Sequence, residues 1–307
     1  MCADREEQAT PDVLAAHLRL AEQYALTPGL DDGSKPSVLN TLSHAIDPNL
    51  ELAEINAWFR SPAPVFAIPF QHKIAAWQQF LKAHSLSFEV QEDIYAFPSH
   101  VSLNEATEHG ICRIQDLGSY LAVKGLELPK GSHVWDCCSG AGGKALSLIE
   151  TYPGIQLTCS DIRPQILENL KERFQQAGLQ TPRLEVLNLE NRTPSEAIGT
   201  FDCIIADVPC AGSGTWRRNP EVPHFFDTGS IEKQAVRQAS IIGNALSRLK
   251  SGGILVYITC SIFESENQRQ LGNLIEKHNL TLLSSGYTTN PAQQRSDYIF
   301  RAVLKKD

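Results

Sequence analysis

The sequence predicts an α/β protein whose main domain is a doubly wound, mostly parallel sheet. After residue 131, short apolar segments alternate with amphipathic segments of helical period, as parallel strands do when helices connect them. A glycine-rich turn follows the first of these strands, and an acidic residue ends the second. No helical segment separates the last two strands, which therefore predict an antiparallel hairpin at the sheet edge.

The residues before this sheet predict two smaller parts. Residues 1–60 predict a helical segment, with one helix near 13–20, a break rich in Pro, Gly and Asp, and a second helix near 50–59. Residues 61–112 predict a small α+β accessory module made of a strand at 65–69, a helix at 74–84 and one alternating strand at 88–97.

The main domain is expected to span residues 113–307. Its apolar segments predict seven strands, at 133–137, 156–160, 184–188, 203–207, 253–259, 281–286 and 297–304. The amphipathic segments between them predict helices at 145–150, 164–177, 231–249 and 264–278.

Composition limits the classes of function. The net charge is −8, but residues 1–115 carry 7 basic and 15 acidic side chains, whereas residues 116–307 carry 20 of each. The acidity therefore opposes a general polyanion-binding surface without excluding a local basic cleft for nucleic acid. The eight cysteines form neither a C-x-x-C metal pair nor a secreted disulfide framework, so we expect no metal site and a reducing, cytoplasmic location. No segment approaches the ~20 apolar residues of a membrane span.

The glycine-rich turn and the acids that follow it predict a nucleoside-binding edge. Glycines at 140, 142 and 143 allow the backbone to approach a ligand at a helix N-terminus. Asp161 ends the second strand, where an acid accepts ribose hydroxyls, and Glu190 follows the third strand, facing the adenine edge. NAD and S-adenosylmethionine both carry such a ribose, and spacing does not separate them. The alternatives are a turn that is only structural, an Asp161 that caps the next helix, and a solvated Glu190.

Two cysteines follow neighbouring strands of this sheet. They stand in Asp207-Val-Pro-Cys210 and in Thr259-Cys260-Ser261. Because the carboxyl ends of parallel strands meet at one edge, we expect the two thiols to lie side by side. The remaining cysteines in or after apolar strands are interpreted as inert and buried: Cys112, Cys137, Cys159 and Cys203.

Four motifs in order make the main domain resemble the Nol/Nop/Sun family of RNA cytosine-C5 methyltransferases. They are Ile114-Gln-Asp-Leu-Gly-Ser119, Asp136-x-Cys138 with Gly142-Gly-Lys144, Asp207-x-Pro-Cys210-x-Gly212-x-Gly214 with Arg217-Arg218-x-Pro220, and Thr259-Cys-Ser261 with Glu266-Asn267. The resemblance implies a Rossmann-like class I domain that uses S-adenosylmethionine, preceded by an accessory module that is RNA-binding-like. The implied cofactor-binding residues are Cys138, Ser139, Gly140, Ala141, Gly142, Gly143, Lys144, Asp161, Glu190 and Asp207.

The resemblance also implies catalytic roles. Cys260 would be the nucleophile that adds to C6 of cytosine, Cys210 would assist release, and Asp207 would hydrogen-bond the base. Candidates for favouring the Cys260 thiolate are Lys144, Arg217 and Arg218, the two arginines being also the expected RNA contacts. A surface salt bridge is the alternative for either arginine. The expected partner is RNA, ribosomal rather than transfer RNA, and the expected state is a monomer.

The glycine turn departs from the family pattern. The family usually has C-A-A-P-G-G-K where this chain has Cys138-Ser-Gly-Ala-Gly-Gly-Lys144, so the turn lacks the proline. Glu190 stands where an Asp is common, and Ile166 where a basic residue is common, with Arg163 as a candidate substitute.

Other functions explain less of the sequence. A non-catalytic assembly factor that binds ribosomal RNA would not need both thiols, and a methyltransferase of proteins or small molecules has no use for paired cysteines. A nicotinamide-dependent oxidoreductase fits the glycine turn but leaves the Asp-x-Pro-Cys segment and the terminal hairpin unexplained.

Overall fold

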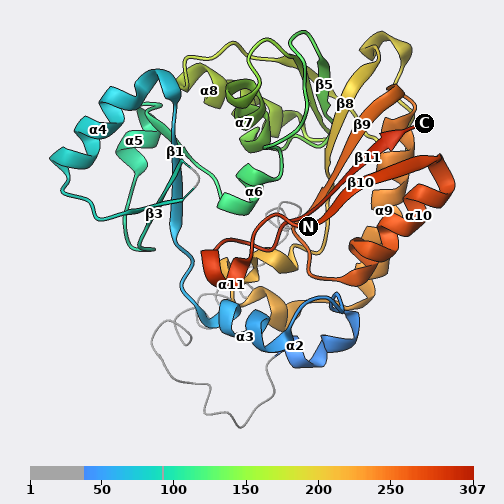
Figure 1. The fold of residues 1–307 in the computed structure, drawn as a ribbon, viewed down its shortest axis with the longest axis horizontal. Coiled ribbons are helices and arrows are strands. Elements are labelled where there is room, and N and C mark those ends of the chain that lie inside the picture. Colours follow the sequence, from blue (N-terminus) through green and yellow to red (C-terminus); the bar gives the residue numbers. More distant parts are fainter. Residues whose placement is uncertain (1–37, 92) are drawn as a thin grey trace.

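The computed structural model describes residues 38–91 and 93–307 (Figure 1). Its largest sheet has seven strands: β5 (His133–Asp136), β6 (Gln156–Asp161), β7 (Arg183–Val186), β8 (Phe201–Asp207), β9 (Leu249–Thr259), β10 (Leu280–Tyr287) and β11 (Phe300–Lys306). They lie in the order β10-β11-β9-β8-β5-β6-β7. The five strands from β9 to β7 are parallel, whereas β11 is antiparallel to both β9 and β10. The predicted parallel sheet with a terminal antiparallel hairpin is confirmed.

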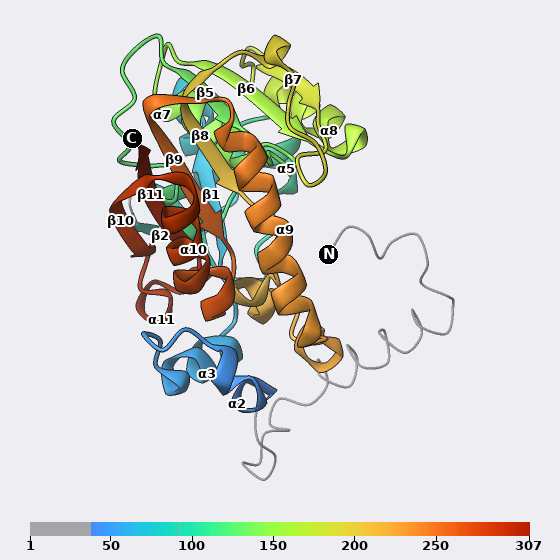
Figure 2. The ribbon, with the colours of Figure 1, turned by 90° about the vertical axis from the view of Figure 1, so that its right-hand side faces the viewer.

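Helices cover both faces of this sheet, as Figure 2 shows. Helices α7 (Gly143–Thr151) and α8 (Pro164–Gln176) cover one face, and α9 (Gly229–Leu246) and α10 (Gln268–His278) cover the other. Val134 packs with the first pair and the next residue, Trp135, with the second. Side chains alternate across a strand, so strands buried on both faces must be continuously apolar, which is why these segments stand out in the sequence.

The accessory module is a four-stranded antiparallel sheet in the order β2-β3-β1-β4. Its elements are β1 (Val65–Pro69), α4 (Ile74–Ala83), β2 (Glu89–Gln91), β3 (Ile94–Phe97), α5 (Asn104–Glu108) and β4 (Cys112–Ile114). The prediction of one strand at 88–97 was wrong, because the segment folds into a hairpin with Asp93 in its turn at φ 67°. An aspartate tolerates this left-handed conformation, and alternation continues across a tight turn. Strand β4 extends two residues past the boundary expected at 112.

The helical segment packs against loops at the carboxyl end of the large sheet. It contains α2 (Val38–Thr41) and α3 (Leu52–Arg60), and α3 corresponds to the helix expected near 50–59. The helix expected near 13–20 lies outside the described residues. Trp58 shares a buried cluster with Trp216, Phe263 and Tyr298, and its indole N–H donates to the Ser296 carbonyl at 2.7 Å. The segment thus joins the main domain rather than standing apart from it.

Two connections in the main domain differ from expectation. The expectation that no helix separates the last two strands was wrong, because α11 (Pro291–Gln294) lies between them, with Asn290 as a side-chain cap and Pro291 in its first turn. The helix expected at 264–278 is divided into a 3-10 turn and α10. The other short helices are α6 (Leu117–Leu121) and the 3-10 turns Ser43–Ala45, Gln71–Lys73, Glu196–Ile198, Ser213–Arg218, Val222–Phe225 and Glu264–Glu266.

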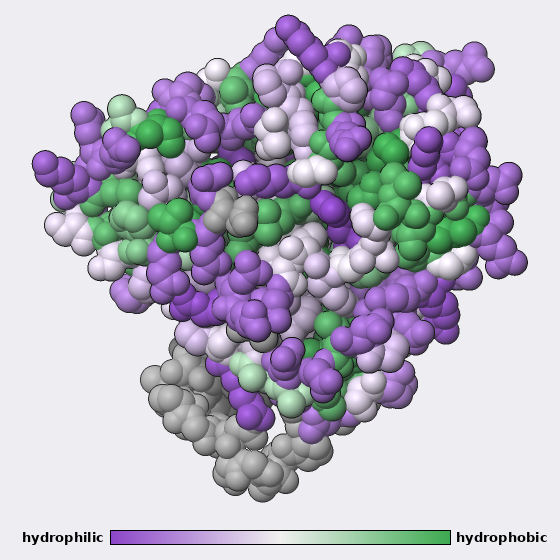
Figure 3. Space-filling model, viewed as in Figure 1, coloured by the Kyte–Doolittle hydropathy of each residue, from purple (hydrophilic) through white to green (hydrophobic). Residues whose placement is uncertain are grey.

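The surface in Figure 3 is largely polar, with apolar residues gathered over the accessory module and toward the β10 edge. Exposed apolar side chains on or beside the edge strands β2 and β10 are Phe88, Val90, Leu282 and Leu283. A register shift between Leu282 and Ser284 interrupts β10, which limits edge-to-edge pairing. Among the described residues, no helix has the length and apolar character needed to cross a membrane.

Candidate functional site

Acids and cysteines gather at the carboxyl edge of the large sheet. Asp136, Asp161 and Asp207 are the last residues of β5, β6 and β8, and Cys260 follows the last residue of β9. These strands are parallel, so their carboxyl ends lie at one edge, where α/β sheets bind ligands. Residues separated by more than a hundred positions in the chain therefore share one site.

The two thiols are in contact, as expected from the sequence. The sulfur of Cys210 lies 3.3 Å from that of Cys260, and both residues are half-buried. The hydrogen bond to Cys260 and burial, with the nearby charge of Glu266, raise the pKa of Cys210 well above its usual value. Cys210 therefore keeps its proton and can donate it toward the Cys260 sulfur.

The loop after β8 packs closely on the loop after β9. The Gly214 N–H donates to the Cys260 carbonyl at 3.0 Å, and Gly214 accepts from the Tyr298 N–H at 3.0 Å. A Cβ at Gly214 would lie 2.2 Å from the Tyr298 carbonyl oxygen, so only glycine permits this approach. Gly212 adopts φ 72° where the 3-10 turn begins. These contacts explain the Gly212-x-Gly214 spacing.

Lys144 places a positive charge beside the cysteines. Its Nζ donates to Asp207 Oδ2 at 2.7 Å, and its side chain is only 10% exposed. Burial disfavours the charged form, but Asp207 and then the Cys260 sulfur outweigh it, so the pKa of Lys144 is raised. Lys144 is therefore a cation at the site.

The glycine-rich turn connects β5 to α7 and contacts the end of β6. Gly140 and Gly142 have φ 50° and 80°, and a Cβ on Gly142 would lie 2.6 Å from Leu170. The Ser139 N–H donates to the Ser160 carbonyl at 2.9 Å, and the Ala141 carbonyl accepts from Arg173 at 2.7 Å. The rest of the turn comprises Cys138, which is half-buried, and Gly143, which begins α7. These hydrogen bonds and close contacts hold the turn against β6 and α8.

Asp161 and Glu190 have defined partners. Asp161 is 6% exposed and accepts from the Gly140 N–H at 3.1 Å and from Arg163 Nε at 3.0 Å. Asp161 Oδ1 also accepts from the backbone N–H of Arg163, the N-cap residue of α8, at 3.0 Å, so the same carboxylate holds the start of this helix. Glu190 accepts from Arg237 Nε at 2.8 Å and is 37% exposed, so it is not simply solvated.

Asp136 belongs to the site although it was absent from the expected set. It is 1% exposed, and neither carboxyl oxygen has a hydrogen-bond partner of good geometry among the described residues. Burial and then the charge of Asp207 raise the pKa of Asp136 to about 7, whereas Lys144 lowers it. An unpartnered buried acid beside Asp161 and Asp207 fits a ligand that carries positive charge, such as a sulfonium or ammonium group. The signal in the sequence is an acid that ends an apolar strand.

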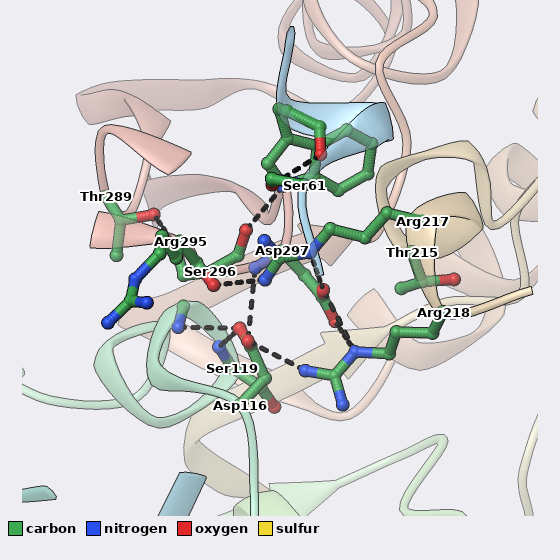
Figure 4. A network of polar contacts seen from close by, with 12 residues as sticks. Ser61, Asp116, Ser119, Thr215, Arg217, Arg218, Thr289, Arg295, Ser296 and Asp297 are labelled. Carbon is green, nitrogen blue, oxygen red and sulfur yellow. Dashed lines mark hydrogen bonds and ion pairs between the residues drawn. The ribbon is translucent and has the colours of Figure 1, made fainter. Parts of the chain in front are cut away.

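Arg217 and Arg218 belong to a buried ionic network (Figure 4). Arg218 donates to Asp297 at 3.0 Å and to Asp116 at 2.9 Å, while Arg217 lies over the Trp58 ring and donates to the Arg295 carbonyl. The Arg217 side chain is 0% exposed and that of Arg218 is 33% exposed. An RNA contact by Arg217 does not fit this buried position, because its guanidinium faces the protein interior. Neither arginine forms a simple surface salt bridge.

Comparisons with known proteins agree with this geometry. Residues 123–303 match the family model described as 16S rRNA methyltransferase RsmB/F. The chain is 31% identical over 221 residues to ribosomal RNA small subunit methyltransferase B of Enterobacter sp. (strain 638), an alignment that covers 69% of this chain and 51% of that protein. The chain therefore spans about half the length of the curated relative that it matches.

Solved structures share the fold. A methyltransferase homolog from Pyrococcus horikoshii has a TM-score of 0.70 at 20% identity, covering 89% of this chain and 100% of its own. NSun6 from Pyrococcus horikoshii, solved with SFG, has a TM-score of 0.75 at 17% identity, covering 89% of this chain and 98% of its own. The predicted Rossmann-like domain of S-adenosylmethionine-dependent methyltransferases is confirmed. With its matched domain, cofactor edge and paired cysteines, the chain belongs to the 16S rRNA methyltransferase RsmB/F family.

Proposed function

We propose that this chain is an S-adenosylmethionine-dependent RNA cytosine-C5 methyltransferase that acts on ribosomal RNA. The observation that carries the proposal is the contact of two thiols, 3.3 Å apart, at the cofactor edge of a methyltransferase sheet. The choice of ribosomal RNA rests on the names of the relatives. A methyltransferase acting on oxygen or nitrogen needs no paired cysteines, whereas attack by the C5 carbon of cytosine needs covalent activation.

Cys260 is the proposed nucleophile. The C5 carbon of cytosine is a poor nucleophile until a thiolate adds at C6, which forms the S–C6 bond and moves an electron pair into an enamine. Lys144 is a cation whose charge interacts with the Cys260 sulfur, while Cys210 retains its proton. Asp207 binds Lys144 through Oδ2, which leaves Oδ1 to accept a hydrogen bond from the amino group of the cytosine and so orient the base.

The acids and the glycine turn are the proposed cofactor-binding residues. S-adenosylmethionine supplies the methyl group as an electrophile when it is bound. Asp161 would accept its ribose hydroxyls, Glu190 would face the adenine edge, and the backbone of the turn 138–144 would approach its remaining part. Asp136 would attract its positive charge. Arg218 is the proposed phosphate contact, because a third of its side chain is exposed.

The test is methyl transfer from labelled cofactor to unmodified 16S ribosomal RNA by the purified protein. We expect label in 5-methylcytosine after digestion to nucleosides. Transfer RNA and an RNA already methylated by the same protein serve as controls. Label in another nucleoside would contradict the carbon target, and transfer only to transfer RNA would contradict the substrate.

Cofactor affinity is expected to depend on pH through Asp136. Its pKa is raised to about 7, and a cationic ligand binds the ionised carboxylate more tightly than the neutral acid. Affinity should therefore rise with pH up to about 7, by at most roughly tenfold per unit, and then level off. Calorimetry across this range measures the effect, and Asp136→Asn should flatten the profile. A flat wild-type profile would contradict the role of Asp136.

A further inference from the structure

We propose that Glu266 is a positioning residue whose one buried carboxylate fixes the Cys210 loop to the Cys260 loop. The catalytic consequence rests on the function proposed above, but the positioning itself concerns only this chain. Glu266 follows β9 in the 3-10 turn Glu264–Glu266 and is 0% exposed. Its side chain reaches back from this turn toward the ends of β8 and β9.

The two carboxyl oxygens hold different loops. Oε1 accepts from the Ala211 N–H at 2.9 Å, and Ala211 is the residue after Cys210. Oε2 accepts from the Ser261 hydroxyl at 2.5 Å, and Ser261 is the residue after Cys260. A single planar group thus spans the two residues that follow the cysteines, and this span agrees with the 3.3 Å separation of the sulfurs.

Gln238 of α9 extends the same link. Its Nε2 donates to Glu266 Oε1 and to the Pro209 carbonyl, both at 3.0 Å, so it holds the residue before Cys210 as well. The Tyr257 hydroxyl lies 2.5 Å from the Glu266 carbonyl oxygen and 2.9 Å from Gln238 Oε1, so its one hydrogen is shared between these two acceptors and links Gln238 to the Glu266 backbone. The Cys210 loop is therefore held on both sides of the cysteine.

Asn267 does the same for Cys260. Its Oδ1 accepts from the Thr259 hydroxyl at 2.6 Å, and its Nδ2 donates to the Ser261 carbonyl at 2.9 Å. The Glu266-Asn267 pair that follows the Thr-Cys-Ser motif thus contacts both neighbours of Cys260. The spacing between the two motifs is explained by this arrangement.

The chemistry of Glu266 favours positioning over packing. A fully buried carboxylate costs free energy unless donors satisfy it, and an apolar side chain would fill the space more favourably. Burial raises the pKa of Glu266 to about 7, and its hydrogen bonds to Ser261, Ala211 and Gln238 lower it. No basic side chain pairs with it within the described ranges, so its partners are the loop groups themselves.

The test measures how closely the thiols are held, without RNA or cofactor. The protein is equilibrated with mixtures of reduced and oxidised glutathione, and the peptide pair joined through Cys210 and Cys260 is quantified by mass spectrometry. One oxidised glutathione takes two electrons and two protons from the thiol pair and becomes two reduced molecules. The equilibrium constant of this exchange has units of concentration and measures the effective concentration of the Cys210 thiol at the Cys260 thiol, so it rises when the two are held closer together.

Glu266→Ala is expected to lower this constant by about tenfold or more, because both loops lose a buried acceptor. Glu266→Asp should also lower it, since the shorter side chain cannot reach both loops. Glu266→Gln should keep the constant within about threefold of wild type. Its amide oxygen still accepts from the Ala211 N–H, and its NH2 can donate to the Ser261 oxygen. The Ser261 hydroxyl can then donate to the Ser213 oxygen, 3.3 Å away. Glu264→Ala, in the same turn, is the matched control and should change nothing.

Turnover provides the second readout. Glu266→Ala should lower kcat for RNA methylation while the KM for cofactor stays the same, and Glu266→Gln should restore kcat. The proposal would be overturned if the disulfide equilibrium constants of both Glu266→Ala and Glu266→Asp equalled that of wild type. It would also be overturned if Glu266→Gln lowered the constant as much as Glu266→Ala, because the charge of Glu266 and not its reach to the two loops would then matter. If Glu266→Ala does not fold, Glu266→Asp decides alone. The two proposals can fail separately. If the wild-type protein methylates no RNA while Glu266→Asp still lowers the disulfide equilibrium constant, the proposed function is contradicted and the positioning role of Glu266 stands.

Discussion

Cys260→Ala is expected to lower the rate of methyl transfer at least about a thousandfold, because the carbon nucleophile is never generated without addition at C6. A single-turnover reaction with labelled cofactor and unmodified 16S ribosomal RNA measures the rate. Cofactor affinity should stay within about twofold of wild type, since the acids and the glycine turn that hold the cofactor are unchanged.

Cys203→Ala provides the matched control. Cys203 is on β8, but its side chain is fully buried, and burial raises its pKa to about 12, so it supplies no thiolate. This variant should keep its activity. An active Cys260→Ala protein together with an inactive Cys210→Ala protein would mean that the two thiols have exchanged the roles proposed here.

Cys210→Ala is expected to trap a covalent complex of protein and RNA. Release needs a base to take the C5 proton, so that the electrons of the C5–H bond form the C5=C6 double bond as the S–C6 bond breaks. The Cys210 sulfur lies 3.3 Å from that of Cys260 and keeps its proton, so it is placed to give that proton to the departing Cys260 sulfur. Without it, addition and methyl transfer proceed but the S–C6 bond persists. A band of RNA-linked protein on a denaturing gel, absent from wild type, measures the accumulation.

The double variant identifies the thiol that forms the link. Cys210→Ala combined with Cys260→Ala should give no covalent complex, because the attacking sulfur is gone. A complex that survives in the double variant would place the nucleophile elsewhere. Failure of Cys210→Ala alone to accumulate any complex, with turnover at the wild-type rate, would contradict a release role for Cys210.

The order of strands and helices in the main domain was predictable from sequence. Strands buried on both faces must be apolar throughout, so they contrast with the amphipathic helices between them. Parallel connection then brings strand ends to one edge, which is why Cys210 and Cys260 could be placed together from their positions alone. The hairpin around Asp93 was missed because a turn within an alternating segment leaves no break in the pattern. Helix α11 was missed because its four residues are too few to show a helical period.

The sequence by itself determined the sheet, its cofactor edge and the meeting of the two thiols, because periodicity and strand direction depend on local order along the chain. Only the tertiary structure decided the surroundings of each group. The burial of Arg217, the unpartnered state of Asp136 and the reach of Glu266 to both cysteine loops depend on side chains from distant segments. Burial and hydrogen-bond geometry are properties of packed neighbours, and no local pattern specifies which neighbours those are.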